Sequence, residues 1–337
     1  MSEMSLLNGR AILITGGTGS FGRTCAEYIL RHAQPYKLII FSRDEAKQHE
    51  MAQVLSAESH SCLRYFIGDV RDERRLRRAF DGVDFVIHAA ALKQVPACEY
   101  NPIEAVKTNV MGAQNIINAA IDTGVKRVVA LSTDKAASPV NLYGATKLCS
   151  DKLFTAGNVY SGVHRTRFST VRYGNVVGSR GSVIPLFKRL RATGELPITD
   201  PEMTRFWITL DHGVRFVLQA LNNMTGGEMF VPKIPSMRVQ ELAQALAPEC
   251  RLRIIGIRPG EKLHETLITE DDARHSLEFK DHFVIEPEFN WWTGDEHRAN
   301  GGRRLAPGFV YASNTNDRWL SEAELHQLLA ESSLALT

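Results

Sequence analysis

The chain has 337 residues, 44% of them hydrophobic and 23% charged, with a formal net charge of +2. This composition is typical of a globular protein and gives no overall field that would favour nucleic acid or an anionic membrane. Five cysteines without CxxC spacing argue against a metal site or a disulfide framework. No apolar run approaches the roughly 20 residues that cross a bilayer, and no signal peptide is evident, so we expect a cytoplasmic protein.

The first half of the chain alternates short apolar runs with segments of helical periodicity. Strands are predicted at residues 10–15, 37–41, 64–68, 84–90, 127–132 and 166–173. Helices are predicted at 20–33, after Asp44 as an N-cap, around 72–80 and 102–123, and at 143–161. Continuous apolar strands separated by helices indicate a parallel sheet covered on both faces, and right-handed crossovers make this α/β sheet doubly wound, as in the Rossmann fold.

The helix predicted at 72–80 carries a cluster of arginines in the segment DVRDERRLRRAF. Leu76, Ala79 and Phe80 form an apolar stripe there, so we interpret the arginines as the solvated face of a helix. A nucleic-acid patch is the alternative, but aromatic residues do not alternate with these arginines.

A glycine-rich turn, TGGTGSFG, joins the first predicted strand to the first helix and places Gly16, Gly19 and Gly22 in a G-x-x-G-x-x-G spacing. Glycines permit the tight turn and let backbone N–H groups approach a pyrophosphate at the start of the helix. Because strand and helix flank it correctly, we predict dinucleotide binding. The residues expected to contact the dinucleotide are Gly16, Thr18, Gly19, Ser20, Phe21, Gly22, Ser42, Arg43, Lys47, Asp69, Val70, Ala89, Ala90, Tyr143 and Lys147.

The second predicted strand is followed by Ser42, Arg43 and Asp44. An acidic residue immediately at the strand end would favour the free ribose hydroxyls of NAD, whereas Ser42 and Arg43 offer donors to a 2′-phosphate. NADP is therefore predicted, although Asp44 leaves NAD open unless its carboxylate only caps the next helix. Asp69 and Val70, after the third strand, are placed to meet the adenine.

The pattern changes after about residue 175, where proline and glycine become frequent and the elements shorter. We expect residues 1–180 to form an NADP-binding Rossmann domain, with 208–230 returning to it. Residues 181–207 and 231–337 should form mainly a smaller C-terminal substrate lobe and a tail. The stretch 289–308, which contains Trp291 and Trp292, is predicted to be an exposed loop before a closing helix at 321–331.

Tyr143 and Lys147 form a Y-x-x-x-K motif eleven residues after Ser132, which with Thr133 follows a predicted strand. Residues i and i+4 share one face of a helix, so the ammonium can lie near the phenol or the nicotinamide ribose. The pKa of a free tyrosine is near 10, and a nearby lysine together with a cationic nicotinamide would lower it. Tyr143 is therefore the candidate that exchanges a proton with a sugar hydroxyl.

These motifs resemble those of the extended short-chain dehydrogenases/reductases that act on nucleotide sugars. The nearer resemblance is to the inverting UDP-N-acetylglucosamine 4,6-dehydratases, which open pseudaminic acid synthesis. It spans nearly the whole chain, and STDK is its most specific element. The segments that carry it are FSRDEAKQ (41–48), HAAALKQVPACEYNP (88–102), STDKAASPVNLYGATK (132–147), RYGNVVGSRGSVIP (172–185), MTRFWI (203–208), RPGEKLHE (258–265) and YASNTNDRWLSEAELHQLL (311–329).

The resemblance implies that UDP-N-acetylglucosamine loses water across C5–C6, with hydride borrowed from C4 and returned to C6. This reaction needs an acid/base pair beyond Tyr143, and Asp134 and Lys135 can supply it unless they form only a surface ion pair. Retaining relatives carry Asp-Glu here, so Asp-Lys indicates inversion at C5 to an L-arabino 4-keto product. Lys135 could be the C5 base only if neutral, which burial and neighbouring positive charge would favour. The expected catalytic set is Thr133, Asp134, Lys135, Tyr143 and Lys147.

Substrate contacts are expected mainly from the second half of the chain. Arg205 and Arg258 suit a diphosphate, because guanidinium binds such oxygens bidentately, and Glu261 can accept hydrogen bonds from the uridine ribose. Each of these residues is alternatively a structural ion-pair partner. His88 is interpreted as a buried, hydrogen-bonded histidine and not as a base. The expected substrate contacts are Lys93, Asn175, Val183, Arg205, Arg258 and Glu261.

Two other interpretations stay open. A 4-epimerase or a retaining dehydratase of the same family would share the cofactor and the substrate class, although an epimerase does not need the extra acid/base pair. A non-enzymatic dinucleotide sensor or scaffold is the third possibility, and the presence of Tyr143 and Lys147 argues against it. The resemblance also implies a homo-oligomer, with a hexamer as the candidate assembly, and a cofactor that stays bound through each cycle.

Overall fold

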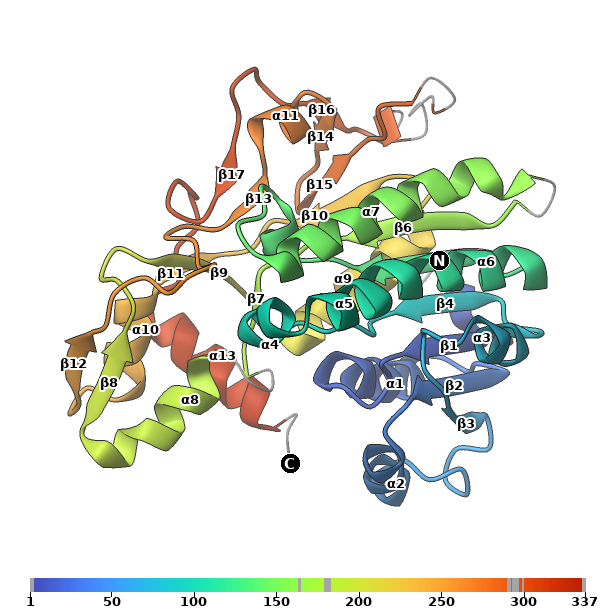
Figure 1. The fold of residues 1–337 in the computed structure, drawn as a ribbon, viewed down its shortest axis with the longest axis horizontal. Coiled ribbons are helices and arrows are strands. Elements are labelled where there is room, and N and C mark those ends of the chain that lie inside the picture. Colours follow the sequence, from blue (N-terminus) through green and yellow to red (C-terminus); the bar gives the residue numbers. More distant parts are fainter. Residues whose placement is uncertain are drawn as a thin grey trace.

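The computed structural model describes residues 3–162, 165–178, 183–289, 292, 297–298 and 300–334. Its largest feature is a sheet of β1 (Ala11–Thr15), β2 (Lys37–Ser42), β3 (Leu63–Ile67), β4 (Phe85–His88), β5 (Arg127–Leu131), β6 (Arg167–Val171), β10 (Met229–Pro232), β14 (Ser276–Glu278), β15 (His282–Ile285) and β16 (Arg303–Arg304). The strand order is β16-β14-β15-β10-β6-β5-β4-β1-β2-β3 (Figure 1). Neighbouring strands from β3 to β10 pair in parallel, and β15, β14 and β16 continue the sheet in antiparallel pairs.

Helices cover both faces of this sheet, because successive strand residues point to opposite sides. On one face α1 (Ser20–His32) and α9 (Leu210–Asn223) share a buried apolar cluster with Ile12 and Ile14 of β1. On the other, α3 (Glu73–Phe80), α6 (Gly112–Thr123) and α7 (Leu142–Tyr160) pack around Leu13. The predicted doubly wound α/β sheet is confirmed.

The helical predictions hold in type, and the structure refines their bounds. Asp44 caps α2 (Glu45–Val54) by accepting a hydrogen bond from the backbone N–H of Lys47. The segment predicted as one helix at 102–123 comprises α5 (Pro102–Ala105), a π-helical stretch η2 (Val106–Met111) and α6. α4 (Val95–Tyr100) has too short a pattern to be predicted from sequence.

The arginine-rich helix α3 has the amphipathic character that was expected of it. Leu76 and Phe80 are fully buried, whereas Arg77 is exposed and pairs with Glu73 at 2.6 Å and Asp122 at 2.8 Å. The helix therefore presents a solvated arginine face, on which Arg77 is ion-paired.

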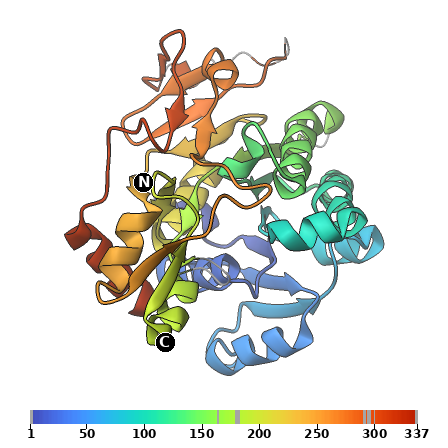
Figure 2. The same cartoon turned by 60° about the vertical axis from the view of Figure 1, so that its left-hand side comes forward.

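A smaller lobe lies at the left of Figure 1, and in Figure 2 its helices gather on the left side of the molecule. Its buried core includes Phe187, Trp207, Leu242 and Leu325. Three small sheets accompany the large one: β7–β9–β11, β8–β12 and β13–β17. The elements concerned are β7 (Asn175–Val176), α8 (Val183–Leu190), β8 (Glu195–Ile198), β9 (Thr204–Ile208), β11 (Ser236–Arg238), α10 (Val239–Leu246), β12 (Arg251–Ile254), β13 (Thr266–Ile268), α11 (Glu270–Ala273), β17 (Tyr311–Ala312) and α13 (Glu322–Leu334).

The large sheet contains more C-terminal residues than the predicted domain boundaries assigned to it. α9 and the start of β10 fall within 208–230 and pack with the sheet, but β14, β15 and β16 lie within 231–337 and extend that sheet as well. Antiparallel strands need no helical crossover, so their sequence lacks the βα alternation that marks the first half. Trp291 lies outside the described residues, and Trp292 donates its indole N–H to the carbonyl of Gly226 at 2.9 Å.

No helix in the described part of the chain has the length and apolar character needed to cross a membrane.

Candidate active site

A cavity of about 990 Å³ lies where the carboxyl ends of β1 to β6 face the smaller lobe. Ligands of doubly wound sheets bind at this edge, and the volume is at the upper end of the range for small-molecule sites. Every residue that the sequence analysis assigned to cofactor, catalysis or substrate lines this cavity. The sequence therefore identified residues that the fold brings to one place, although cavity lining alone does not assign their individual roles.

The glycine turn has the shape that a pyrophosphate requires. Gly16 has a φ of +65°, and a Cβ atom there would lie 2.8 Å from the backbone nitrogen of Ala90. A Cβ atom on Gly22 would come within 2.5 Å of the Cα atom of Gly17, so both positions need glycine. α1 begins just after Gly19 without a side-chain cap, which leaves its first N–H groups available to an anion. These residues fit a dinucleotide.

The end of β2 presents cationic side chains and a carboxylate that is already engaged. Asp44 accepts from the backbone of Lys47 at 3.0 Å and pairs with its Nζ at 2.8 Å. Arg43 is about half exposed, 3.8 Å from Asp69, and the hydroxyl of Ser42 lies 2.9 Å from that of Thr18. The helix-capping role considered for Asp44 is thus observed, and no other carboxylate lies within residues 41–44.

The catalytic candidates meet because a short turn packs on the start of α7. Immediately after β5 the chain forms η3 (Asp134–Ala136), and Gly144 in α7 leaves room for the carbonyl of Lys135 against the helix. Asn141 caps α7 through the backbone N–H of Gly144 at 2.8 Å. The turn and the cap together hold residues 133–135 beside Tyr143.

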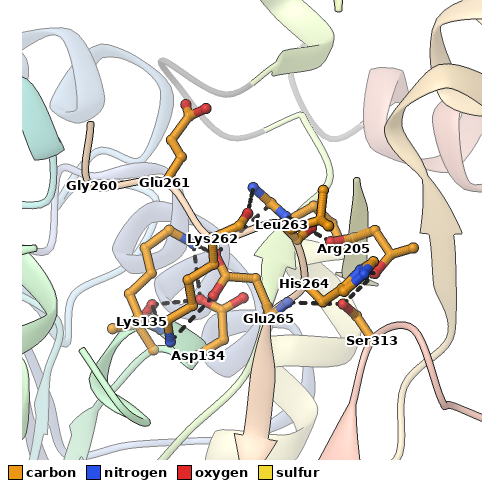
Figure 3. A network of polar contacts seen from close by, with 12 residues as sticks. Asp134, Lys135, Arg205, Gly260, Glu261, Lys262, Leu263, His264, Glu265 and Ser313 are labelled. Carbon is orange, nitrogen blue, oxygen red and sulfur yellow. Dashed lines mark hydrogen bonds and ion pairs between the residues drawn. The ribbon is translucent and has the colours of Figure 1, made fainter. Parts of the chain in front are cut away.

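Lys135 lies between two carboxylates, and this corrects the expected electrostatics. Its Nζ is 3.0 Å from Oδ1 of Asp134 and 3.1 Å from Oε1 of Glu265 (Figure 3). Burial favours the neutral amine, but these two carboxylates outweigh it and raise the pKa of Lys135. The neutral amine that Lys135 would need to act as the C5 base is thus not favoured by its nearest charged neighbours, which are anionic.

The phenol of Tyr143 is also less acidic than expected. Burial raises the pKa of Tyr143 to about 12, against lowering contributions from the Lys135 cation and a hydrogen bond with Thr133. Lys147 is buried, its Nζ lies 3.4 Å from Oγ of Ser150, and burial lowers its pKa. In the protein alone, the Lys135 cation thus favours the charged form of Tyr143, whereas burial disfavours it.

The two arginines expected at the substrate differ in how many of their N–H donors are free to bind it. The Arg205 guanidinium is buried and donates to the carbonyls of Thr204, Lys262 and Leu263 at 2.7 to 3.0 Å, so it holds the segment 262–263 and has few donors left for a diphosphate. Arg258 is exposed and lies 3.5 Å from Glu261.

The other expected substrate contacts lie on either side of the cavity. Lys93 lines the cavity, Val183 starts α8, and Oδ1 of Asn175 is buried without a hydrogen-bond partner in the described structure. His88 is buried with its Nδ1 2.7 Å from the hydroxyl of Thr15, and burial lowers its pKa to about 3. It is the hydrogen-bonded core histidine that was predicted.

Sequence reasoning missed Glu265, which pairs with Lys135, and Asp151, whose charge raises the pKa of Lys147. Glu265 is 1% exposed and belongs to RPGEKLHE, a segment that carried the resemblance but offered no clue to its partner. Asp151 follows Lys147 by one helical turn, and that i+4 spacing is the signal that could have found it. Among the described residues, no group of three or more His, Cys, Asp or Glu side chains could hold a metal ion.

The parallel sheet, the glycine turn and the paired Tyr143 and Lys147 define a dinucleotide-binding protein of the extended short-chain dehydrogenase/reductase class. More specifically, the chain belongs to the polysaccharide biosynthesis protein family, whose profile matches residues 12–287.

Individual relatives agree with this membership. An inverting UDP-N-acetylglucosamine 4,6-dehydratase of Campylobacter jejuni is 55% identical over 331 residues, covering 96% of this chain and 98% of its own. A UDP-glucose 4-epimerase of Rickettsia canadensis is 40% identical, covering 95% of both chains. The resemblance to the inverting dehydratases is confirmed at the level of sequence.

Solved structures agree as well. The X-ray structure of Pen from Bacillus thuringiensis is 36% identical and superimposes with a TM-score of 0.88 over 97% of this chain and 99% of that one. DesIV of Streptomyces venezuelae, a dTDP-glucose 4,6-dehydratase with NAD and TYD bound, is 26% identical with a TM-score of 0.67 over 75% of this chain and 86% of that one.

Proposed function

We propose that this protein dehydrates UDP-N-acetylglucosamine between C4 and C6 with inversion at C5. The product is UDP-2-acetamido-2,6-dideoxy-β-L-arabino-hex-4-ulose, and the reaction is the first step of pseudaminic acid biosynthesis. The observation that carries the proposal is the Asp134–Lys135 ion pair in the nucleotide cavity, on a turn that packs against the helix of Tyr143. The 55% identity to an inverting dehydratase supports the same activity.

NADP is the cofactor that the end of β2 favours. The Asp44 carboxylate is engaged in helix capping and with Lys47, while the Arg43 guanidinium remains about half exposed on the cavity wall. A 2′-phosphate would meet a cation there instead of a free carboxylate. Ser42, Arg43 and Lys47 would hold the adenosine end of bound NADP, which would supply the reversible hydride transfer that oxidation at C4 and reduction at C6 require.

The side chains of this protein move the protons. Tyr143 takes the proton of the C4 hydroxyl as the ketone forms, and Thr133 orients the phenol through their hydrogen bond. The ketone acidifies C5–H, and Asp134 with Lys135 handle the C5 proton and the departing C6 hydroxyl, which leaves as water. A proton then returns to C5 from the opposite face. The net change is the loss of one water molecule.

Substrate binding is assigned to both sides of the cavity. The Arg258 guanidinium is available to the diphosphate, and Glu261 is available to the uridine ribose once the two residues separate from each other. We assign Lys93, Asn175 and Val183 to the sugar side, and Arg205 to the support of the 262–263 segment.

The assembly and location follow from the same proposal. We infer a homo-oligomer, because Tyr100, Ile103 and Met111 expose apolar side chains on neighbouring elements, and sedimentation velocity can test for the hexamer. We infer a cytoplasmic location, because free thiols are typical of a reducing compartment and the structure has them at Cys25, Cys62, Cys98, Cys149 and Cys250.

NMR of a reaction in deuterated water tests the activity. Incubation with UDP-N-acetylglucosamine should give a C6 methyl group, deuterium at C5 and L-arabino geometry. Release of UDP-N-acetylgalactosamine without loss of water would identify a 4-epimerase instead, and D-xylo geometry would identify a retaining dehydratase.

Replacement of Lys135 tests the residue assignment. Lys135→Glu should lower kcat by about 100-fold or more, or change the configuration at C5, while NADP stays bound. Lys135→Met is the matched control, because it removes the ammonium without adding a third carboxylate beside Asp134 and Glu265. Unchanged rate and stereochemistry in both variants would remove Lys135 from the mechanism.

A further inference from the structure

The side chain of Asn141 makes two hydrogen bonds of opposite kind. Its Oδ1 atom accepts from the backbone N–H of Gly144 at 2.8 Å, which caps α7 beside Tyr143. Its Nδ2 group donates to the carbonyl of Gly260 at 2.8 Å, although the two residues are 119 positions apart in the sequence. An amide offers an acceptor and a donor at its two ends, whereas a carboxylate offers only acceptors. One side chain thus joins the helix of Tyr143 to a distant segment.

Gly260 lies in the turn that brings together the two residues assigned to the nucleotide. The N–H of Glu261 donates to the carbonyl of Arg258 at 3.1 Å, and Gly260 between them has a φ of +78°. A Cβ atom on Gly260 would lie 3.1 Å from Cβ of Asn141 and 3.4 Å from Cγ1 of Val95. Glycine permits both this backbone angle and this close approach, so the main chain of the turn packs directly on the start of α7.

A second contact holds the same segment on the other side of Glu261. Nζ of Lys262 donates to the carbonyl of Ala137, the residue that follows η3. Glu261 therefore lies between two anchored residues, and its side chain points away from Lys135 (Figure 3). The position of Glu261 relative to the catalytic turn and to α7 is set by these two anchors and not by its own side chain.

We propose that Asn141 is a positioning residue that fixes the turn 258–261 on the catalytic helix and thereby sets the affinity for the nucleotide part of the substrate. This inference rests on the proposed function, in which Arg258 contacts the diphosphate and Glu261 the uridine ribose. The sugar reacts only where its C4 lies at Tyr143, so the nucleotide contacts must stay at a fixed distance from the start of α7. The amide of Asn141 holds this distance, because a single planar group contacts both parts.

Asn141→Ser separates the two hydrogen bonds and tests the proposal. Serine caps helices about as well as asparagine, so Tyr143 should keep its place, but the shorter side chain does not reach the carbonyl of Gly260 as well. Calorimetric titration with UDP should give a Kd raised about 5- to 10-fold, because binding must then order a turn that is already ordered in the unmodified protein. KM for UDP-N-acetylglucosamine should rise by a similar factor, with kcat within about twofold.

Asn141→Asp provides a second variant in which only the donor is lost. Its carboxylate can still cap α7, so the Kd of UDP should rise at least as much as in Asn141→Ser. Hydrogen exchange measured by mass spectrometry reads the anchor without any ligand. Exchange over residues 258–265 should be faster in both variants, while exchange within α7 should stay as in the unmodified protein.

Thr209→Ala is the matched control for a merely structural role. Thr209 caps α9 by accepting from the backbone N–H of His212 at 3.1 Å, and it is not among the described residues that line the cavity. Its replacement should lower the melting temperature without changing the Kd of UDP or the exchange over 258–265. Asn141→Ala removes a cap and the anchor together, so it should lower the melting temperature and also raise the Kd.

The outcomes distinguish the role of Asn141 from the proposed activity. An unchanged Kd of UDP in Asn141→Ser and Asn141→Asp overturns the proposal, whatever their exchange, and so does a fall in kcat with KM unchanged. A rise confined to Asn141→Asp would come from its added charge and overturns it as well. NMR of the product formed by the unmodified protein tests the activity separately. If the C6-methyl product forms while the variants bind UDP normally, only the role of Asn141 fails, whereas formation of a 4-epimer rejects the proposed function.

Discussion

Ser132 donates a hydrogen bond from its Oγ to Oδ2 of Asp151 across 2.6 Å, and this contact joins the residue after β5 to the interior of α7. Asp151 is buried beside Lys147, and Nη2 of Arg172 lies 3.9 Å from its carboxylate. Burial raises the pKa of Asp151, while Lys147, Arg172 and Ser132 all favour its charged form. One carboxylate thus faces both the lysine of the Y-x-x-x-K motif and Arg172, whose nearer ion pair is with Asp272 at 2.9 Å.

Asp151→Asn should therefore destabilise the protein strongly. The variant leaves buried Lys147 without this counter-ion, while Arg172 keeps Asp272 at 2.9 Å, and removing one partner of a buried pair costs about 3–5 kcal/mol. Urea unfolding measures the loss. Asp122→Asn is the matched control, because Asp122 pairs with Arg77 on the surface at 2.8 Å and its replacement should cost less than about 1 kcal/mol. Equal losses in the two variants would contradict this account of Asp151.

Gly16 and Gly9 form a matched pair that separates backbone strain from crowding. Their φ angles are +65° and +67°, but a Cβ atom on Gly9 meets nothing within 4 Å, whereas one on Gly16 lies 2.8 Å from the nitrogen of Ala90. Gly9→Ala should cost only the left-handed conformation, about 1–2 kcal/mol. Gly16→Ala should cost more and weaken NADP binding at least about tenfold, as measured by urea unfolding and fluorescence titration. Similar behaviour of both variants would show that the turn tolerates a side chain.

The choice between NADP and NAD is expected to depend on Arg43. Its guanidinium lies on the cavity wall 3.8 Å from Asp69, and loss of a charge-assisted contact to a 2′-phosphate is worth about 1.5–3 kcal/mol. Arg43→Ala should raise the Kd of NADP by about 10- to 100-fold and leave that of NAD within about threefold. Calorimetric titration with both dinucleotides measures this, with Arg64→Ala as a control outside the cavity lining. An equal loss for the two dinucleotides would remove Arg43 from recognition of the phosphate.

The parts of this protein that sequence could predict are those that depend on local pattern. Strands β1 to β6 are continuous apolar runs, and the glycine turn lies between a strand and a helix. The order of these elements along the sequence was enough to predict the Rossmann fold. Tyr143 and Lys147 are separated by one helical turn, and Asp134 and Lys135 are adjacent. Residues this close in the sequence keep their relative positions whatever the tertiary structure of the rest of the chain.

The parts that escaped prediction depend on contacts between distant segments. The charge state of Lys135 is governed partly by Glu265, and the donors of Arg205 are taken by carbonyls at 262 and 263. A rule that pairs arginine with diphosphate cannot anticipate a main-chain loop that takes the same donors. β14 to β16 extend the sheet by antiparallel pairing, which has no βα signature. These features depend on contacts between segments that are far apart in the sequence.

His88 provides a prediction in which pH changes stability and not catalysis. Burial lowers its pKa to about 3, well below the value near 6.5 of an unfolded histidine, so only the unfolded chain takes up this proton between those values. The contribution of neutral His88 is fully present above about pH 6.5 and is lost as the pH falls, by about 2 kcal/mol at pH 5. His88→Asn can keep the contact with Thr15. Between pH 7.5 and 5 its free energy of unfolding, measured in urea, should fall by about 2 kcal/mol less than that of the unmodified protein. His49→Asn, at an exposed histidine, should follow the unmodified protein, and an identical acid response of all three would show that His88 is not the group that titrates.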